Sequence, residues 1–178
     1  MTQLQEQRIK NHIEEVRDFP KPGISFKDIT PVLRNPGLCR DILDEMESVA
    51  GKLAPDIIVG LESRGFMFGF ALAQRLDAGF IPVRKPGKLP RDVYSESYDL
   101  EYGSAVLELH QEDILPGSRV LIHDDLLATG GTAAAAASLI KKVGAELVGY
   151  DFLVEISYLN GRHLLPAKVP VHSMVKYA

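Results

Sequence analysis

The sequence has a single cysteine, no uninterrupted run of about 18 apolar residues, and no excess of positive charge. One cysteine, Cys39, cannot form an intramolecular disulfide or a cysteine-rich zinc cluster, so a reducing compartment is expected. The missing apolar run argues against a membrane-spanning helix, and residues 1–15 are too polar for a signal peptide. We therefore expect a cytoplasmic protein with no membrane partner.

The charge balance is mildly acidic, with 20 Lys and Arg against 24 Asp and Glu and a formal net charge of −4. Such a balance offers no general attraction for nucleic acid or an anionic membrane. A phosphate-bearing ligand would therefore need a local site, and we expect that ligand to be small. The length of 178 residues fits a single domain, residues 1–178, that is large enough to bury a core.

Short apolar runs alternate with helical patterns along most of the chain. Continuous apolar strands alternating with helices are typical of a largely parallel sheet covered on both faces, so the sequence predicts an α/β fold. The expected strands are residues 56–60, 79–83, 104–109, 119–123, 146–154 and 169–175. The expected helices are residues 4–16, 35–53, 65–76 and 132–143.

Residues 85–103 contain two prolines, two glycines and several charges, without helical or strand periodicity. Loops longer than about 12–15 residues are uncommon in compact domains and are usually lids, binding loops or disordered segments. Tyr94, Tyr98 and Tyr102 would give this segment apolar surface with which to dock. We therefore favour a flexible lid over passive disorder.

Two adjacent aspartates, Asp124 and Asp125, end an apolar strand and precede a turn rich in hydroxyls and glycines, before an expected helix. The carboxyl end of such a strand is where open α/β sheets bind ligands. Glycines allow close backbone approach, and the N-terminus of a helix favours an anion. No lysine follows the glycines and the G-x-G-x-x-G spacing is absent, so neither common nucleotide loop applies. The pattern predicts a phosphate monoester site; the alternative is a capped turn with solvated aspartates.

Residues 120–132 resemble the 5-phospho-α-D-ribose 1-diphosphate (PRPP) motif of the type I phosphoribosyltransferases. Further segments resemble motifs of the adenine branch of this family, in the same order: residues 23–31, 60–66, 84–90 and 100–103. The resemblance covers nearly the whole chain. It implies the type I phosphoribosyltransferase fold, with a lid and a small hood to which the N-terminal segment contributes.

The resemblance also implies an activity. The expected enzyme is a pentosyltransferase of purine salvage that converts adenine and PRPP to AMP and pyrophosphate, with Mg²⁺ and as a homodimer. The resemblance assigns the ribose 2′- and 3′-hydroxyls to Asp124 and Asp125. Carboxylates accept hydrogen bonds from vicinal diols and backbone amides donate to phosphate, so the chemistry agrees. It assigns the 5′-phosphate to Ala128, Thr129, Gly130, Gly131 and Thr132.

For the pyrophosphate, the resemblance implies a contact from Arg64, reached through a Glu62–Ser63 peptide that is cis in relatives. Arg84 and Lys85 match basic residues that approach pyrophosphate, in some relatives across the dimer interface. No residue is assigned directly to the metal, because the resemblance implies Mg²⁺ carried by PRPP and pyrophosphate. The alternative for Arg64 is a solvated arginine at a helix start.

For the base, Phe26 resembles the aromatic residue that stacks on adenine, and the backbone groups of Ile24 and Lys27 resemble those that read its edge. Stacking of this kind contributes about 1–3 kcal/mol. Glu101 resembles the proposed acid–base residue of the family, and its neighbour Tyr102 belongs with the substrate-binding residues. From the residues alone, Phe26 could instead be a core side chain and Glu101 a solvated charge.

Two competing functions stay open. One is a purine phosphoribosyltransferase for guanine or xanthine; the other is a regulator of the same fold that senses PRPP and binds nucleic acid. The acidic chain has no basic stripe or spare domain, which disfavours the regulator and a nucleic-acid partner. The five histidines lack metal-ligand spacing. His123 stands where the family usually has an aliphatic residue, and its ring is expected to touch the neighbouring aspartate.

Overall fold

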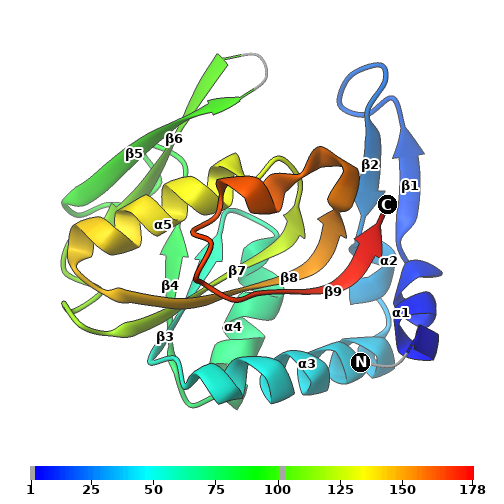
Figure 1. The fold of residues 1–178 in the computed structure, drawn as a ribbon, viewed down its shortest axis with the longest axis horizontal. Coiled ribbons are helices and arrows are strands. Elements are labelled where there is room, and N and C mark those ends of the chain that lie inside the picture. The colour runs from blue at the N-terminus through cyan, green and yellow to red at the C-terminus, as the bar shows by residue number, and fades with distance from the viewer. Residues whose placement is uncertain (1–2, 101–102) are drawn as a thin grey trace. The chain divides into compact units, whose positions relative to one another are not determined.

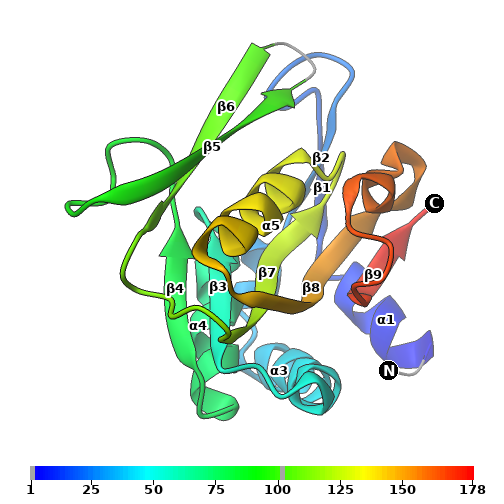
Figure 2. The same cartoon turned by 60° about the vertical axis from the view of Figure 1, so that its left-hand side comes forward.

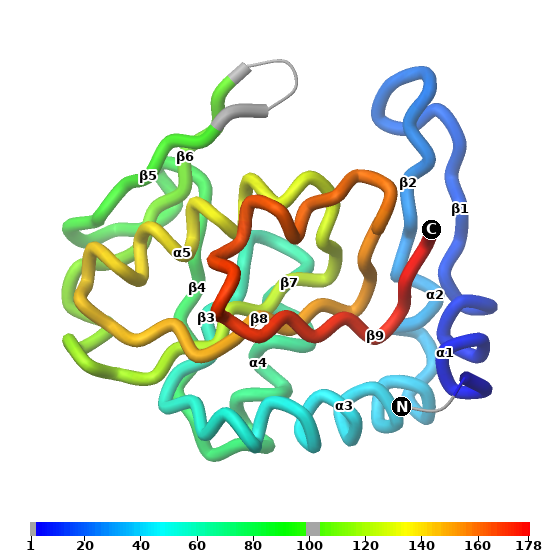
Figure 3. Tube along the Cα trace, viewed as in Figure 1, coloured from blue at the N-terminus to red at the C-terminus, as the bar shows by residue number. Residues whose placement is uncertain are grey.

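The structure is a computed structural model that describes residues 3–100 and 103–178. The chain divides into two compact units, Met1–Glu45 and Met46–Ala178, and each is considered by itself. Figure 1 shows the helices and strands of both units, and Figure 3 shows the course of the backbone. In the part of the chain so described, no helix combines the length and apolarity needed to cross a membrane.

The first unit holds a short antiparallel hairpin between helices. The strands β1 (Glu14–Arg17) and β2 (Ser25–Asp28) pair with Val16 opposite Phe26. The helix expected over residues 4–16 is therefore wrong beyond its first two turns, because pairing with β2 supplies hydrogen bonds to the second half of that segment. The helices are α1 (Gln3–Lys10), α2 (Thr30–Leu33) and α3 (Pro36–Ala50), the last of which continues into the second unit.

The second unit is built on a five-stranded sheet in the order β4-β3-β7-β8-β9, and all neighbouring strands are parallel. The strands are β3 (Ile57–Leu61), β4 (Gly79–Val83), β7 (Arg119–Leu127), β8 (Glu146–Ile156) and β9 (Val171–Tyr177). Five of the six apolar runs form these strands. The expected α/β class with a parallel sheet is confirmed.

Helices α4 (Gly65–Arg75) and α5 (Gly131–Val143) lie on opposite faces of this sheet, as Figures 1 and 2 show. Under α5, small and branched apolar side chains from the helix and the strands make the main core; Ala136, Leu139, Val59 and Ile122 are fully buried there. The alanine run of α5 lets its backbone approach the sheet closely. Three short 3-10 segments complete the unit: η1 (Gly51–Leu53), η2 (Ser157–Leu159) and η3 (Gly161–Leu164).

A separate antiparallel hairpin, β5 (Val93–Leu100) and β6 (Gly103–His110), lies along α5 (Figure 2). Lys142 of α5 helps to fasten it there: its Nζ lies 2.5 Å from Glu96 Oε2 and donates to the Ser95 carbonyl at 2.7 Å. The expectation that residues 85–103 lack regular structure is therefore wrong for residues 93–100. Alternating serines and charged residues hide the strand pattern, and pairing with β6 determines the structure.

Candidate active site

The two aspartates lie within strand β7, which runs four residues beyond the end expected at His123. Pairing with β8 extends it, with Asp124 opposite Phe152 and Leu127 opposite Glu155. Asp125 is almost fully buried, with 5% of its side chain exposed, and Asp124 is half-buried. The carboxyl end of a central parallel strand therefore carries both carboxylates, as the sequence predicts.

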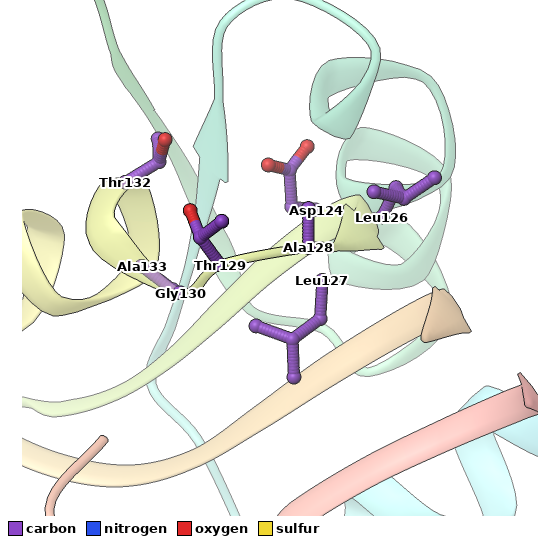
Figure 4. A pocket seen from close by; sticks show the side chains of 8 residues that line it. All are labelled: Asp124, Leu126, Leu127, Ala128, Thr129, Gly130, Thr132 and Ala133. Atoms are coloured by element: carbon purple, nitrogen blue, oxygen red, sulfur yellow. The ribbon is translucent and has the colours of Figure 1, made fainter. Parts of the chain in front are cut away.

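The turn between β7 and α5 has the geometry of an anion site. Gly130 has a φ of +87°, a left-handed conformation that favours glycine, and α5 begins at Gly131 with no side-chain cap on its N-terminus. The first backbone N–H groups of this 13-residue helix have no partner within the helix. Figure 4 shows the Asp124 carboxylate and the hydroxyls of Thr129 and Thr132 on the same side of this loop, around a small pocket.

The two aspartates differ in their surroundings. Burial, and then the charge of Asp125, raise the pKa of Asp124 well above its usual value. The Asp125 N–H donates to Asp124 Oδ1 at 2.8 Å. On the other carboxylate, Arg64 Nε donates to Asp125 Oδ2 at 2.5 Å. The arrangement places one well-paired carboxylate beside one that accepts a proton easily.

A larger cavity of about 370 Å³ adjoins the loop. It brings six of the residues singled out in the sequence together from three separate segments. Those that line it are Arg64, Lys85, Asp124, Asp125, Ala128 and Thr132, alongside Glu62, Ser63, Tyr98, Leu107 and Leu126. Cations and carboxylates therefore share one cavity that Ala128 and Thr132 of the phosphate-type loop help to line.

Glu62 organises the basic side of this cavity. It accepts from Arg84 Nε at 3.2 Å and from the Lys85 backbone N–H at 2.9 Å. Burial opposes ionisation of this carboxyl, but the hydrogen bonds and charges of Arg84 and Lys85 outweigh it and lower its pKa. Arg84 also lies over the Phe66 ring, 5.9 Å from its centroid, while Lys85 lines the cavity. The Glu62–Ser63 peptide is cis, as the resemblance implied.

Sequence reasoning missed two contacts of the loop. The Thr132 hydroxyl donates to the Tyr98 hydroxyl of β5 at 3.3 Å, whereas the sequence indicates Tyr98 only as a docking side chain of the lid. Gly161 of η3 lies against the backbone of Ala128 and Gly130. The Asn160-Gly161 turn was a visible signal for a bend, but nothing local pointed to its partner.

The residues expected to bind the base fall in the first unit, on and beside β2. There Phe26 makes an edge-to-face contact with Phe19, with ring centroids 5.2 Å apart. Lys27 Nζ lies 3.0 Å from Glu15 Oε2, and Ile24 precedes the strand. These contacts neither support nor oppose a role in base binding. Glu101 and Tyr102, expected in acid–base work and substrate binding, lie outside the described residues.

His123 contacts Asp151 of β8 and not the adjacent aspartate, which corrects that expectation. Its Nδ1 lies 3.1 Å from Asp151 Oδ2, and His172 Nδ1 of β9 lies 2.5 Å from the other oxygen. Burial alone would raise the pKa of Asp151, but the two histidines outweigh it and lower the value. The His123 side chain faces the opposite side of the sheet from Asp124, because successive residues of a strand face opposite sides.

Known proteins resemble this chain over nearly its whole length. Residues 31–158 match the family model described as a phosphoribosyl transferase domain. The adenine phosphoribosyltransferase of Gloeobacter violaceus is 52% identical over 169 residues, which cover 95% of this chain and 99% of that protein. This chain belongs to the adenine phosphoribosyltransferase family.

Solved structures of adenine phosphoribosyltransferases agree. The crystal structure from Rhodothermus marinus has a TM-score of 0.95 at 49% identity and covers 99% of this chain and 100% of its own. The Saccharomyces cerevisiae protein, complexed with an imino-altritol bisphosphate and adenine, has a TM-score of 0.90 at 42% identity, covering 97% and 99%. The type I phosphoribosyltransferase fold is confirmed, and the chain is a pentosyltransferase of purine salvage.

Proposed function

We propose that this chain transfers the 5-phosphoribosyl group of PRPP to adenine and releases AMP and pyrophosphate. The observation that carries the proposal is the single cavity in which Asp124 and Asp125 meet a helix N-terminus on one side and Arg64 and Lys85 on the other. A sugar that bears a phosphate at one end and a diphosphate at the other would place one anionic group at the helix N-terminus and the other beside Arg64 and Lys85. The related yeast structure, with a sugar-like bisphosphate and adenine, supports the same pair of ligands.

In this proposal the loop of residues 128–132 binds the 5′-phosphate. Its backbone N–H groups and the hydroxyls of Thr129 and Thr132 donate to the phosphate oxygens. Asp124 and Asp125 accept from the ribose 2′- and 3′-hydroxyls. Burial raises the pKa of Asp124, and hydrogen bonds donated by the ribose hydroxyls would stabilise the charged form of this carboxyl and oppose that effect.

Arg64 and Lys85 bind the diphosphate that leaves. Their charges stabilise the negative charge that grows on pyrophosphate in the transition state while positive charge grows on the ribose ring. Arg64 is bonded to Asp125 here, so binding of the diphosphate would share or exchange that partner. Arg84 lies one step back and acts through Glu62, which it helps to keep ionised.

Mg²⁺ is proposed as the metal that accompanies PRPP. The described residues include no cluster of three or more His, Cys, Asp or Glu that could hold a metal ion by themselves. Mg²⁺ is commonly bound through substrate phosphates and few carboxylates, so we expect the ion to arrive with PRPP. When bound, the ion would neutralise charge on the departing diphosphate.

For the base, Phe26 is proposed to stack on adenine while backbone groups of Ile24 and Lys27 read its amine edge. A 6-oxo purine reverses donor and acceptor at that edge, which would leave polar groups unpaired and so select adenine. Glu101 is proposed to share a proton with N7 as N9 attacks C1′, with Tyr102 beside it, when residues 85–103 close as a lid. The structure of the Giardia lamblia protein with 9-deazaadenine supports a purine ligand in the family.

We also propose a homodimer in the cytoplasm. The exposed Met67 and Phe70 on α4 support the first, because two large apolar side chains on one helix favour burial against a partner. Light scattering at micromolar concentration is expected to give twice the chain mass of 19.6 kDa. Cell fractionation tests the location.

One assay tests the reaction: PRPP-dependent nucleotide formation with adenine, hypoxanthine, guanine and xanthine in parallel. We expect strong preference for adenine and loss of activity when Asp124 and Asp125 are both changed to Asn. Comparable turnover of guanine or xanthine would favour the competing purine enzyme. PRPP binding without turnover of any base, together with nucleic-acid binding, would favour the regulator.

A further inference from the structure

A second turn, at Gly161, packs against the phosphate loop of residues 128–132, although the reaction chemistry assigns no role to that turn. A Cβ added at Gly130 would lie 3.0 Å from the carbonyl carbon of Gly161 and closer still to its oxygen. A Cβ added at Gly161 would lie 2.9 Å from the Gly130 nitrogen and would overlap the Ala128 oxygen. The two backbones therefore touch without side chains between them.

Arg162 holds this second turn in place. Its Nε and Nη2 donate to the two oxygens of Glu155 on β8, both at 2.7 Å. Its Nη1 donates to the Val171 carbonyl at 3.0 Å, and Nη2 also reaches the Ser173 hydroxyl of β9 at 3.2 Å. One planar guanidinium thus ties the turn to two strands of the sheet, a geometry that a lysine ammonium cannot reproduce.

The charges of this pair are secure. Burial of Glu155 would raise its pKa, but the hydrogen bonds from Arg162 and Ser173 outweigh that effect and lower it. Only 7% of the Glu155 side chain is exposed. Removing Arg162 would therefore leave a buried carboxylate unpaired, and we expect the turn to move so that water can reach it.

A loop with two adjacent glycines has many conformations, and most of them do not aim its N–H groups at one point. Contact with Gly161 removes much of that freedom before a ligand arrives. Binding then costs less conformational entropy, which is the basis of preorganised affinity. The cost of misplacing such a loop is large, since a shift of about 1 Å can reduce a rate by about 10²-fold.

We propose that Gly161 and Arg162 are positioning residues for the 5′-phosphate loop: Arg162 fixes the turn, and the turn fixes the loop. This inference rests on the proposed function, because it assumes that residues 128–132 bind the phosphate. It adds a requirement that the reaction chemistry alone does not imply. The turn touches the backbone of the loop, and Arg162 acts only through that turn.

The test compares three variants with two matched controls. Arg162→Lys and Arg162→Met remove the guanidinium that bonds Glu155, and Gly161→Ala adds a Cβ that would collide with the backbone of the loop. Arg119→Met is the control for the arginines. Arg119 also donates to a glutamate of β8, Glu146 at 2.9 Å, and to two backbone carbonyls, those of Leu53 and Ala54. Glu146 begins β8, so this contact lies at the opposite end of the strand from Glu155. Gly79→Ala is the control for the glycine, because its Cβ would come no closer than 3.6 Å to another atom.

Ribose 5-phosphate binding by calorimetry, the KM values for PRPP and adenine, and thermal unfolding are measured for each. We expect the Arg162 and Gly161 variants to bind ribose 5-phosphate about tenfold or more weakly and to raise the KM for PRPP similarly, with that for adenine within about twofold. Arg162→Lys should recover little. Arg119→Met should lower the melting temperature and Gly79→Ala should not, and neither control should change either KM.

Two outcomes separate failure of this inference from failure of the proposed function. If the wild type binds neither ribose 5-phosphate nor PRPP, the proposed function is wrong. If the wild type binds them and the Arg162 variants bind equally well while losing only thermal stability, the positioning role is wrong. Should Gly161→Ala fail to fold, the Arg162 variants decide the matter alone, because they add no volume to the turn.

Discussion

Replacing Gly130 with alanine tests whether the loop must hold one backbone shape. The change has two costs in the structure. A φ of +87° is left-handed, which costs an L-residue with a Cβ about 1–2 kcal/mol. The new Cβ also lies 3.0 Å from the Gly161 carbon, so the backbones must part by at least about 0.4 Å to reach ordinary contact, and further for the oxygen.

Gly144→Ala is the matched control, because Gly144 ends the same helix with a φ of +80° but its Cβ would meet nothing nearer than 3.6 Å. Both variants should unfold at a lower temperature through the backbone term. Only Gly130→Ala should raise the KM for PRPP, by about tenfold to 10²-fold, because only it displaces the loop. Initial rates at varied PRPP and saturating adenine measure this. Equal PRPP KM values for the two variants would refute the reasoning.

Four further results are expected. Thr132→Ala removes a hydroxyl donor and should raise the KM for PRPP more than that for adenine; unchanged PRPP binding by calorimetry would place the phosphate elsewhere. Amide exchange of residues 88–101 should slow when PRPP and a base analogue bind together, and equal protection with and without ligands would contradict a gating role. In single-turnover AMP formation, Glu101→Leu should lose about 10²–10⁴-fold and Glu101→Gln somewhat less, with Asp99→Asn as control, so a Glu101→Leu rate near that of the wild type would remove the residue from the mechanism. Asp151 has a lowered pKa, so its charge stabilises the fold fully above the ordinary aspartate pKa, and this stabilisation is lost as the pH falls through the lowered pKa. Chemical denaturation should therefore show Asp151→Asn to be less stable than the wild type at neutral pH, with the difference shrinking in acid.

The central sheet was predictable because strands buried on both faces of a parallel sheet are continuous apolar runs, and such runs are visible in the sequence. The run 79–83 became β4 with the same bounds, and the run 56–60 became β3 shifted by one residue. The hairpin strand β5 was not predictable in this way. One of its faces carries Tyr94, Glu96 and Tyr98, a mixture that resembles a polar loop until β6 is paired with it.

The site divides in the same manner between local and distant information. Asp124 to Thr132 form one continuous segment, so residue types and their order alone indicated a phosphate loop. Lys85 and Arg64 could be named only through the resemblance. The contact between Gly161 and Gly130 joins residues 31 positions apart, and no pattern near either one contains the other. Sequence periodicity reports which face a residue takes and says nothing about which distant backbone lies against it.

His123 shows how a departure from the usual aliphatic residue at one position is accommodated by distant residues. A buried imidazole needs a polar partner, and Asp151 on the neighbouring strand supplies one at 3.1 Å, with its second oxygen bonded to His172. The ring also needs room: a Cβ at Gly69 of α4 would lie 3.3 Å from its Cδ2 atom. An aliphatic side chain at 123 would require no polar partner. The histidine therefore belongs to a set spread over β7, β8, β9 and α4, directly behind the strand end that carries Asp124, and its inward position separates it from the carboxylates of the cavity.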